Sequence, residues 1–201
     1  MVTPRPNDYQ NIPLRPVGIQ IMAAWDPAKD TAAGLQCKSY GAPIIMNVPE
    51  HVHITWQDEQ TLKLETDAGE QTRLFHFAPS PAEAQGPRTW QGYSEAAWQL
   101  PPRGRGAVSK PAWGDLKVTT SNLKAGYLRK NGVPYSEQAQ VLEDLDLVRI
   151  PEANGQQWVM MIDTETVTDP VYLTRTLLTT AQFLKQPSDA GWEPSACSAM
   201  W

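Results

Sequence analysis

Residues 51–78 read HVHITWQDEQTLKLETDAGEQTRLFHFA and contain three short runs in which apolar and polar residues alternate. The runs occupy 51–57, 61–66 and 71–78, with polar turn-forming residues between them. A period of two is typical of β-strands with one buried face, and short connections favour antiparallel neighbours. This stretch therefore predicts three consecutive antiparallel strands.

Five further runs of the same kind follow, at 88–100, 115–121, 139–150, 156–167 and 171–184. Eight antiparallel strands must hide their sheet edges, and closure into a barrel or packing into two sheets is the usual solution. We expect an all-β fold, a single antiparallel up-and-down barrel that is lipocalin-like, with a two-sheet β-sandwich as the alternative. The last run also fits a partly helical stripe, because its leucines recur at helical spacing.

The length of 201 residues is typical of one domain. Residues 1–14 are rich in Pro, Asn and Gln and predict an extended N-terminal arm, with the barrel domain covering 15–201. Residues 17–25 fit either a strand or a short helix that ends at Asp26-Pro27. Long connections are expected at 101–114 and at 122–138, and long structured loops at a barrel mouth often carry function.

The overall charge argues against a nucleic-acid-binding protein. The chain has 17 Lys and Arg against 22 Asp and Glu, a net charge of −5. Its most basic point, Arg103-Gly104-Arg105, is too small to form the basic face that nucleic-acid binding requires. No window approaches the roughly 18 apolar residues that span a bilayer, so no membrane insertion is expected. The composition leaves the oligomeric state open.

The chain has two cysteines, Cys37 and Cys197, which are too far apart for a local metal motif. They are either two buried thiols or one long-range disulfide, and we favour the disulfide because Cys197 lies in a Trp/Pro/Ser-rich tail. A disulfide would indicate an exported protein, periplasmic or secreted. The N-terminus lacks the apolar core of a secretory leader, so export would require a leader that this sequence does not carry.

All three histidines lie in residues 51–76. His51 and His53 share one face of the predicted strand, and His76 on a nearby strand would complete a three-imidazole site for zinc or copper. Alternation also allows His51 and His53 to face solvent, with Val52, Ile54 and Trp56 facing the core. The histidines are thus candidate metal ligands for a metal-dependent enzyme.

Several charged residues share a strand face with apolar residues, as Arg73 does with Phe75 and Glu143 with Leu145. A buried charge must be paired or reach water, because its isolated burial costs several kcal/mol. Arg73 and Glu143 are therefore expected either to form an internal pair that fixes strand register or to anchor a ligand.

Asp163 and Glu165 also share a strand face, with carboxylates near the spacing that glycosidases use. Such pairs are common on outward strand faces as well. The sequence contains no nucleophile elbow, phosphate loop or dinucleotide fingerprint, so familiar nucleophilic or cofactor chemistry is not indicated.

Aromatic residues provide the remaining candidates for ligand binding. Trp90 and Trp98 share a face with small residues between them, which would leave room for a flat ring. A neighbouring strand could fill the same room. In the loop 122–138, Tyr127 and Arg129 could cap a barrel cavity as polar anchors.

Five segments together resemble an uncharacterised family of exported bacterial proteins. The similarity covers roughly Cys37 to Cys197 and rests on QTRLFHF, TWQGYSEAAW, LKVTTSNLKAGYLRKNGVPYS, DPVYLTRTLLTTAQF and WEPSAC. The resemblance implies export and a single domain, and it implies no activity because none is assigned to that family.

Three functions follow as hypotheses. The first is binding, or cofactor-free transformation, of a small apolar or aromatic molecule in a barrel cavity. Its binding residues would be Arg73, Trp90, Trp98, Tyr127, Arg129 and Glu143. The second is a metal-dependent enzyme with zinc or copper on His51, His53 and His76. The third is a structural or interaction subunit that packs through its N-terminal arm.

Overall fold

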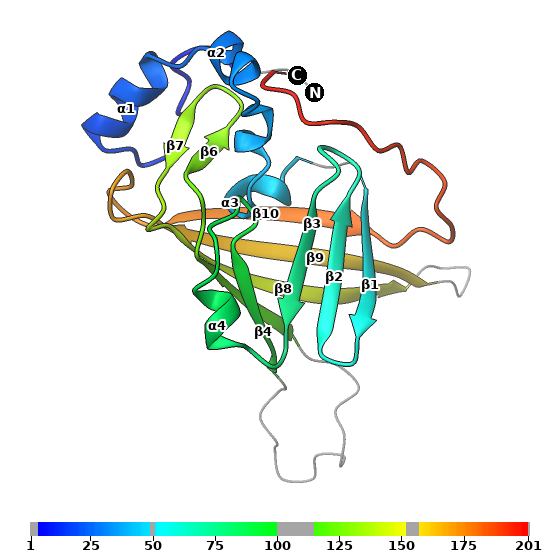
Figure 1. Ribbon diagram of the computed structural model, residues 1–201. Helices are drawn as coiled ribbons and strands as arrows, with labels where there is room; N and C mark the ends of the chain where they lie inside the picture. The colour runs from blue at the N-terminus through cyan, green and yellow to red at the C-terminus, as the bar shows by residue number, and fades with distance from the viewer. Residues whose placement is uncertain (1–3, 49–50, 100–114, 152–156, 201) are drawn as a thin grey trace.

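The computed structural model describes residues 4–48, 51–99, 115–151 and 157–200 (Figure 1). The described residues are mostly β, with 44% strand and 15% helix. Its main element is an eight-stranded sheet with the order β1-β2-β3-β4-β5-β8-β9-β10, which curls into a half-barrel. The predicted β class is therefore confirmed at this coarser level.

All eight predicted runs contain a strand of this sheet. The strands are β1 (Val52–Asp58), β2 (Thr61–Thr66), β3 (Thr72–His76), β4 (Tyr93–Gln99), β5 (Asp115–Ser121), β8 (Gln140–Pro151), β9 (Gln157–Thr168) and β10 (Leu177–Leu184). The last run begins as a turn and becomes β10, so its helical alternative is wrong. The expected loop at 101–114, with Arg103 and Arg105, lies outside the described residues.

One pairing differs from the expected up-and-down order, because β3 and β4 are parallel, with Phe75 opposite Ser94. The connection between them carries the short helix α4 (Pro81–Ala84) and is long enough for the crossover that parallel strands need. It ends at Gly92, whose φ of +63° turns the chain into β4, and a Cβ there would collide with the carbonyl of Ser121. The strand consequently begins at Tyr93 instead of residue 88.

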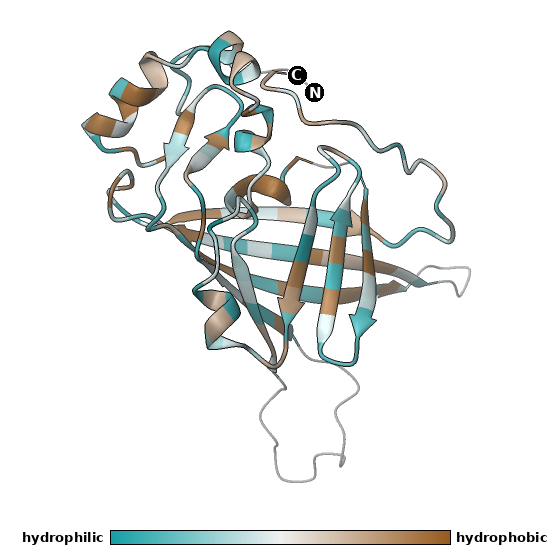
Figure 2. Cartoon of the chain, viewed as in Figure 1, coloured by the Kyte–Doolittle hydropathy of each residue, from teal (hydrophilic) through white to brown (hydrophobic). Residues whose placement is uncertain are grey.

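Buried and more exposed residues alternate along β2, β5 and most of β9, as period-two alternation requires. Hydrophobic and hydrophilic bands follow one another along the strands in Figure 2. The buried apolar residues form two clusters. One contains Leu64, Phe75 and Val118 from the sheet, with Ile45 and Met46 from the N-terminal part of the chain. The other contains residues from the N-terminal arm, the loop before β8 and the ends of β8 and β9.

The N-terminal part of the domain forms a helical cap on the sheet that the alternation pattern does not predict. Its elements are α1 (Pro16–Ala23), α2 (Pro27–Ala32), the 3-10 helix η1 (Gln36–Ser39) and α3 (Ala42–Ile45). Each of the three α-helices has a proline in its first turn, where the missing N–H costs nothing. The open choice at 17–25 is thereby settled as helix.

A two-stranded hairpin packs beneath this cap, formed by β6 (Gly126–Arg129) and β7 (Val133–Tyr135). It occupies the region expected to be a long loop. The N-terminal arm lies against it: Ile12 and Leu14 are buried, and the Arg129 guanidinium donates to the carbonyl of Gln10 at 3.0 Å. The described part of the arm, from residue 4, is therefore packed onto the domain.

The predicted disulfide between Cys37 and Cys197 is present. It joins η1 to the C-terminal segment, which also makes a bridge between Ser195 and Ala68. Among the helices of the described residues, none combines the length and the apolarity needed to cross a bilayer.

Candidate functional site

Arg73 and Glu143 form the internal pair that the sequence analysis considered. The Arg73 guanidinium donates to both carboxylate oxygens of Glu143 at 2.6 Å, and both side chains are fully buried. The same guanidinium donates to the Thr120 hydroxyl at 3.2 Å. Arg73 lies on β3 and Glu143 on β8, so the curl of the sheet brings together two strands that are not neighbours in it.

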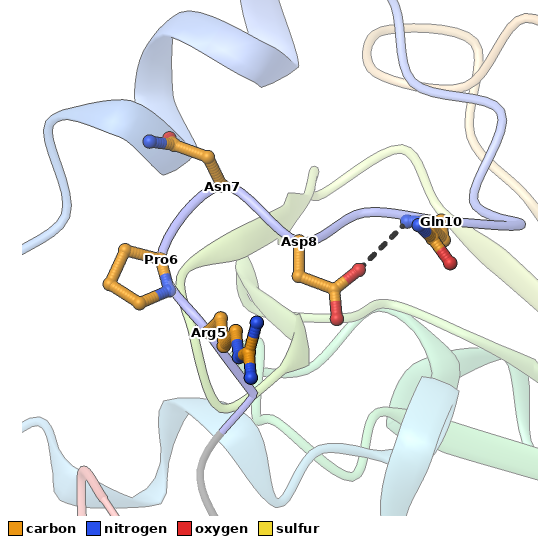
Figure 3. Close-up of a pocket in the computed structure, with 5 residues that line it drawn as sticks. All are labelled: Arg5, Pro6, Asn7, Asp8 and Gln10. Carbon is orange, nitrogen blue, oxygen red and sulfur yellow. Dashed lines mark hydrogen bonds between the residues drawn. The ribbon is translucent and has the colours of Figure 1, made fainter.

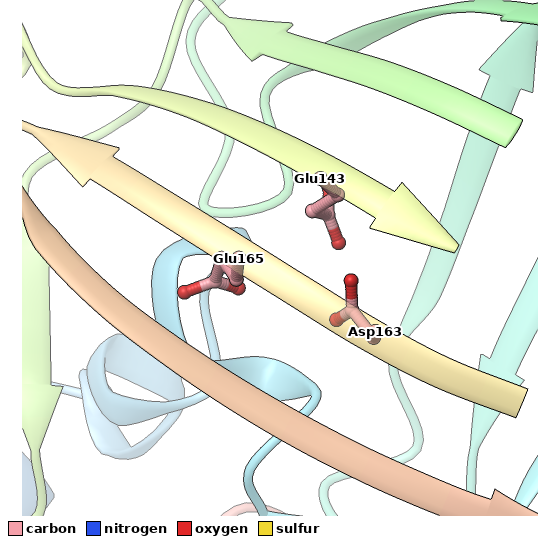
Figure 4. Close-up of side chains that lie close together, drawn as sticks. All are labelled: Glu143, Asp163 and Glu165. Carbon is pink, nitrogen blue, oxygen red and sulfur yellow. The ribbon is translucent and has the colours of Figure 1, made fainter. Parts of the chain in front are cut away.

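Two further carboxylates lie beside this pair. Strand pairing places Glu165 of β9 directly opposite Glu143, and Asp163 lies two residues away on the same face. Each of the three side chains offers an oxygen within 4.8 Å of the others. Figure 4 shows the carboxylates of Glu143 and Asp163 directed at each other, with Glu165 beside them. We refer to Glu143, Asp163 and Glu165 as the carboxylate triad.

The triad is short of hydrogen-bond donors. Within the described residues, neither carboxylate oxygen of Asp163 has a hydrogen-bond partner, nor does Oε2 of Glu165. Burial, followed by the charge of Glu143, raises the pKa of Asp163 to about 8. Burial also raises the pKa of Glu165, with Glu143 and Asp163 adding to the effect. The interior thus disfavours ionisation of all three carboxylates together.

Burial also decides what Asp163 and Glu165 can act on. They face the interior and not the outer side of β9, since both are completely or almost completely inaccessible to solvent. A sugar chain has no access to them, so their pairing does not serve glycoside hydrolysis. The arrangement suits a proton or a small ion.

A second feature is a row of aromatic rings at one end of the inner face. Phe77 lies between Trp56 and Trp98, with ring centroids 5.3 Å from the first and 5.7 Å from the second. Trp56 is 54% exposed and Trp98 52% exposed. We refer to these three residues as the aromatic row.

Strand direction explains why the aromatic row forms. β1, β3 and β4 run in the same direction, because β2 is antiparallel to β1 and β3 and because β4 is parallel to β3. Their C-terminal ends meet at one edge, where Figure 1 shows the arrowheads of β1 and β3. Trp56 and Trp98 lie near the ends of their strands, and Phe77 directly follows β3.

The other predicted anchors lie in separate surroundings. Trp90 precedes β4 and donates its indole N–H to the Ala125 carbonyl, while Lys124 lies over its ring. Trp90 therefore contacts the segment before β6, whereas Trp98 contacts Phe77. Tyr127 accepts from the Lys38 ammonium at 3.2 Å, and burial raises its pKa.

The three histidines have separate partners. His51 lies 2.9 Å from Asp67, His53 stacks on Trp192 and His76 stacks on Tyr93. Strand pairing places His53 opposite Glu65 and His76 opposite Thr61. These partners are four residues apart on β2, which corresponds to about 13 Å at 3.3 Å per residue. The structure does not bring the histidines together.

Two of the hollows on the surface of the described chain bear on the expected ligand site. One, of about 420 Å³, is lined by Arg5, Pro6, Asn7, Asp8 and Gln10 of the arm (Figure 3). The other, of about 470 Å³, lies between α2 and the C-terminal segment. Neither contains a predicted binding residue, so neither supports the expected ligand site.

Sequence reasoning identified Arg73, Glu143 and Trp98 as candidates but assigned Trp56 to the core. The sequence indicated the strand face on which Trp56 lies, but not its exposure to solvent. Its parity does place it on the inner face, but its exposure depends on its position at the strand end. Phe77 was also not selected as a binding residue. Its candidacy depends on its contacts with Trp56 and Trp98, which only the structure shows.

Comparisons with protein-family models, with curated proteins and with solved structures found no match.

Proposed function

We propose that the protein binds a small, flat, apolar or aromatic molecule that stacks on the aromatic row. The observation that carries this proposal is the exposure of Trp56 and Trp98, each above half, on the face that buries the core elsewhere. Large apolar side chains grouped on a surface commonly mark an interaction site. Indole rings also offer flat faces on which another ring can stack.

The surroundings of the aromatic row favour an apolar ligand. Leu147 lies at an inner-face position of β8, which runs parallel to β4, and it is 67% exposed. The ligand would continue the core toward the open end of the half-barrel. The proposed ligand would lie on the inner face of a curled sheet, as in a lipocalin-like protein. It would lie at the edge of that face.

The proposed compartment is the periplasm or the extracellular space. The disulfide between Cys37 and Cys197 supports it, because disulfides persist mainly in oxidising compartments. The resemblance to a family of exported bacterial proteins is in line with the same proposal.

Titration with 1-anilinonaphthalene-8-sulfonate, whose fluorescence increases in apolar surroundings, tests the proposal. We expect saturable binding to one site and competition by uncharged naphthalene. Trp98→Ala and Trp56→Ala should each weaken binding by about twofold to tenfold or more, because a stacked ring contributes about 0.5–1.5 kcal/mol beyond the area that it buries.

Trp158→Ala is the matched control. Trp158 is 42% exposed and lies on β9 at a position of the opposite parity to Asp163, hence on the outer face. It should leave binding unchanged. Equal binding by all three variants would contradict the proposal. Loss of a dimer in Trp98→Ala, without loss of dye binding, would instead identify the row as a contact between two copies of the chain.

A further inference from the structure

The geometry points to a binding site for one hard divalent cation, Ca²⁺ or a cation of similar chemistry, formed by the carboxylate triad inside the half-barrel. This inference does not depend on the proposed function, because the triad and the aromatic row share no residue.

The spacing of the triad suits a cation. Oxygen ligands of Ca²⁺ lie about 2.3–2.6 Å from the ion, so oxygens up to about 5 Å apart can share one ion. One oxygen from each member of the triad lies within 4.8 Å of one oxygen from each of the others. They come from two neighbouring strands, β8 and β9, whose pairing is continuous from Gln140 to Pro151. A continuous ladder holds the ligands on a rigid element.

An independent observation is the state of Asp163. Its side chain is completely buried, and within the described residues neither of its carboxylate oxygens has a hydrogen-bond partner. Figure 4 shows this carboxylate aimed into the triad, at Glu143. Buried polar groups are nearly always satisfied, so an unpartnered carboxylate aimed at two other carboxylates calls for a partner, and a cation is one that suits all three. A cation between Asp163 and Glu143 supplies that partner.

The charge of the cluster also fits a divalent cation. Arg73 carries one positive charge, and the triad carries three negative charges when all its members are ionised, a state that burial disfavours without a cation. The remainder is two negative charges in a site without solvent access, which is strongly unfavourable. One divalent cation neutralises this remainder.

The ligand chemistry selects the kind of cation. The triad supplies carboxylate oxygens, which suit Ca²⁺, Mg²⁺ and Mn²⁺, and contains neither the imidazoles nor the thiolates that zinc and copper favour. The hydroxyl of Thr179 lies 3.5 Å from Glu165 and provides another oxygen beside the triad.

The triad lies one strand from β10, the edge strand of the sheet. Strand pairing places Ala181 opposite Asp163 and Thr179 opposite Glu165. Both of these β10 residues are small and partly exposed. Entry of an ion would require local opening of the edge, and only small side chains of β10 would have to move for it.

The test is cation binding by chelator-treated protein, measured by calorimetry with Ca²⁺, Mg²⁺ and Mn²⁺ and by thermal unfolding. We expect one equivalent of at least one of these cations. At a hundredfold excess over Kd, the cation should raise the melting temperature by about 5–10 °C. Asp163→Asn should abolish both effects, because the amide removes a charged ligand while keeping the shape of the side chain.

Two further variants make the result specific. Glu165→Gln should also lose the cation. Asp146→Asn, on the opposite face of β8, should retain binding and the thermal shift. Failure of the wild-type protein to bind any of the three cations at millimolar concentration would overturn the inference, as would equal binding by Asp163→Asn. Dye binding at the aromatic row should be the same in all these variants, so failure of one proposal is distinguishable from failure of the other.

Discussion

Arg73 and Glu143 are joined by two short hydrogen bonds between β3 and β8, in surroundings closed to solvent. Burial disfavours the charged form of Arg73 and lowers its pKa. The negative charges of Glu143, and then of Glu165 and Asp163, more than offset the effect of burial, so the pKa of Arg73 is raised. The guanidinium is therefore the fixed charge around which the three carboxylates are arranged.

Removal of Arg73 alone should destabilise the fold severely. We expect Arg73→Met to lower the free energy of unfolding by about 3–5 kcal/mol, because it leaves a buried carboxylate without its partner. Urea denaturation measures the change. Lys63→Met, at the partly exposed ion pair with Glu65, should cost at most about 1 kcal/mol. The double variant Arg73→Met/Glu143→Leu should recover much of the loss, and a cost for Arg73→Met as small as that of Lys63→Met would contradict this account of the pair.

The raised pKa values of Asp163 and Glu165 predict how stability depends on pH when a chelator removes divalent cations. Both groups bind protons more tightly in the folded state than in the unfolded chain. Their contribution to the free energy of unfolding is therefore complete below about pH 4. It is lost as the pH rises toward 8, where Asp163 titrates. Urea unfolding at a series of pH values should show stability falling over this window. Asp163→Asn should flatten the slope, and a rise in stability over the same window in the wild type would contradict the assignment.

The sequence pattern identified Arg73 and Glu143 as charged residues on apolar strand faces, because each has apolar neighbours two residues away. They did not place Asp163 and Glu165 inside, because β9 has apolar residues on both faces. Met161 and Val167 share the parity of the two acids, whereas Ile162 has the opposite parity. Only the pairing of Glu165 with Glu143 decides which face is buried.

At the scale of elements, the eight strands of the sheet were predictable because alternation is a local property. The helical cap and the β6–β7 hairpin were not. Their elements have only three to eight residues, and a proline lies inside β7. Such short elements are stabilised by contacts with the sheet and the arm. The sequence of each element alone does not predict those contacts.

The disulfide connects η1 of the helical cap to the C-terminal segment. It closes a loop with a sequence separation of 160 residues. Cys37→Ser/Cys197→Ser should lower the free energy of unfolding by up to about 5 kcal/mol in the chain-entropy model. Guanidinium denaturation with and without a reducing agent measures this. The reducing agent should destabilise the wild type and leave the double variant unchanged, and insensitivity of both would contradict a structural role.

At the scale of the whole molecule, the direction of β4 determines what the half-barrel presents to solvent. The parallel pairing with β3 brings the C-terminal ends of β1, β3 and β4 to one edge. An up-and-down order would have placed Trp98 at the opposite end from Phe77. This direction depends on a long crossover, whose path is not encoded in a local pattern, so the aromatic row could not be predicted from the sequence.

The two proposals assign different roles to the two ends of the inner face. The aromatic row lies at the open edge, where a ligand can reach it. The carboxylate triad lies on β8 and β9, where its side chains are buried. Ligand binding at the edge requires the half-barrel to keep its curl, and the Arg73–Glu143 pair is one of the contacts that join β3 to β8.

The most direct test of the proposed ligand site is an NMR titration that follows the indole N–H signals of ¹⁵N-labelled protein during addition of naphthalene. Trp56→Phe, Trp98→Phe and Trp158→Phe assign the three signals. Stacking on the aromatic row predicts that the signals of Trp56 and Trp98 shift together and saturate at one equivalent, while that of Trp158 stays in place. Shifts confined to Trp158, or unchanged signals for Trp56 and Trp98 at saturating naphthalene, would contradict a binding site on the aromatic row.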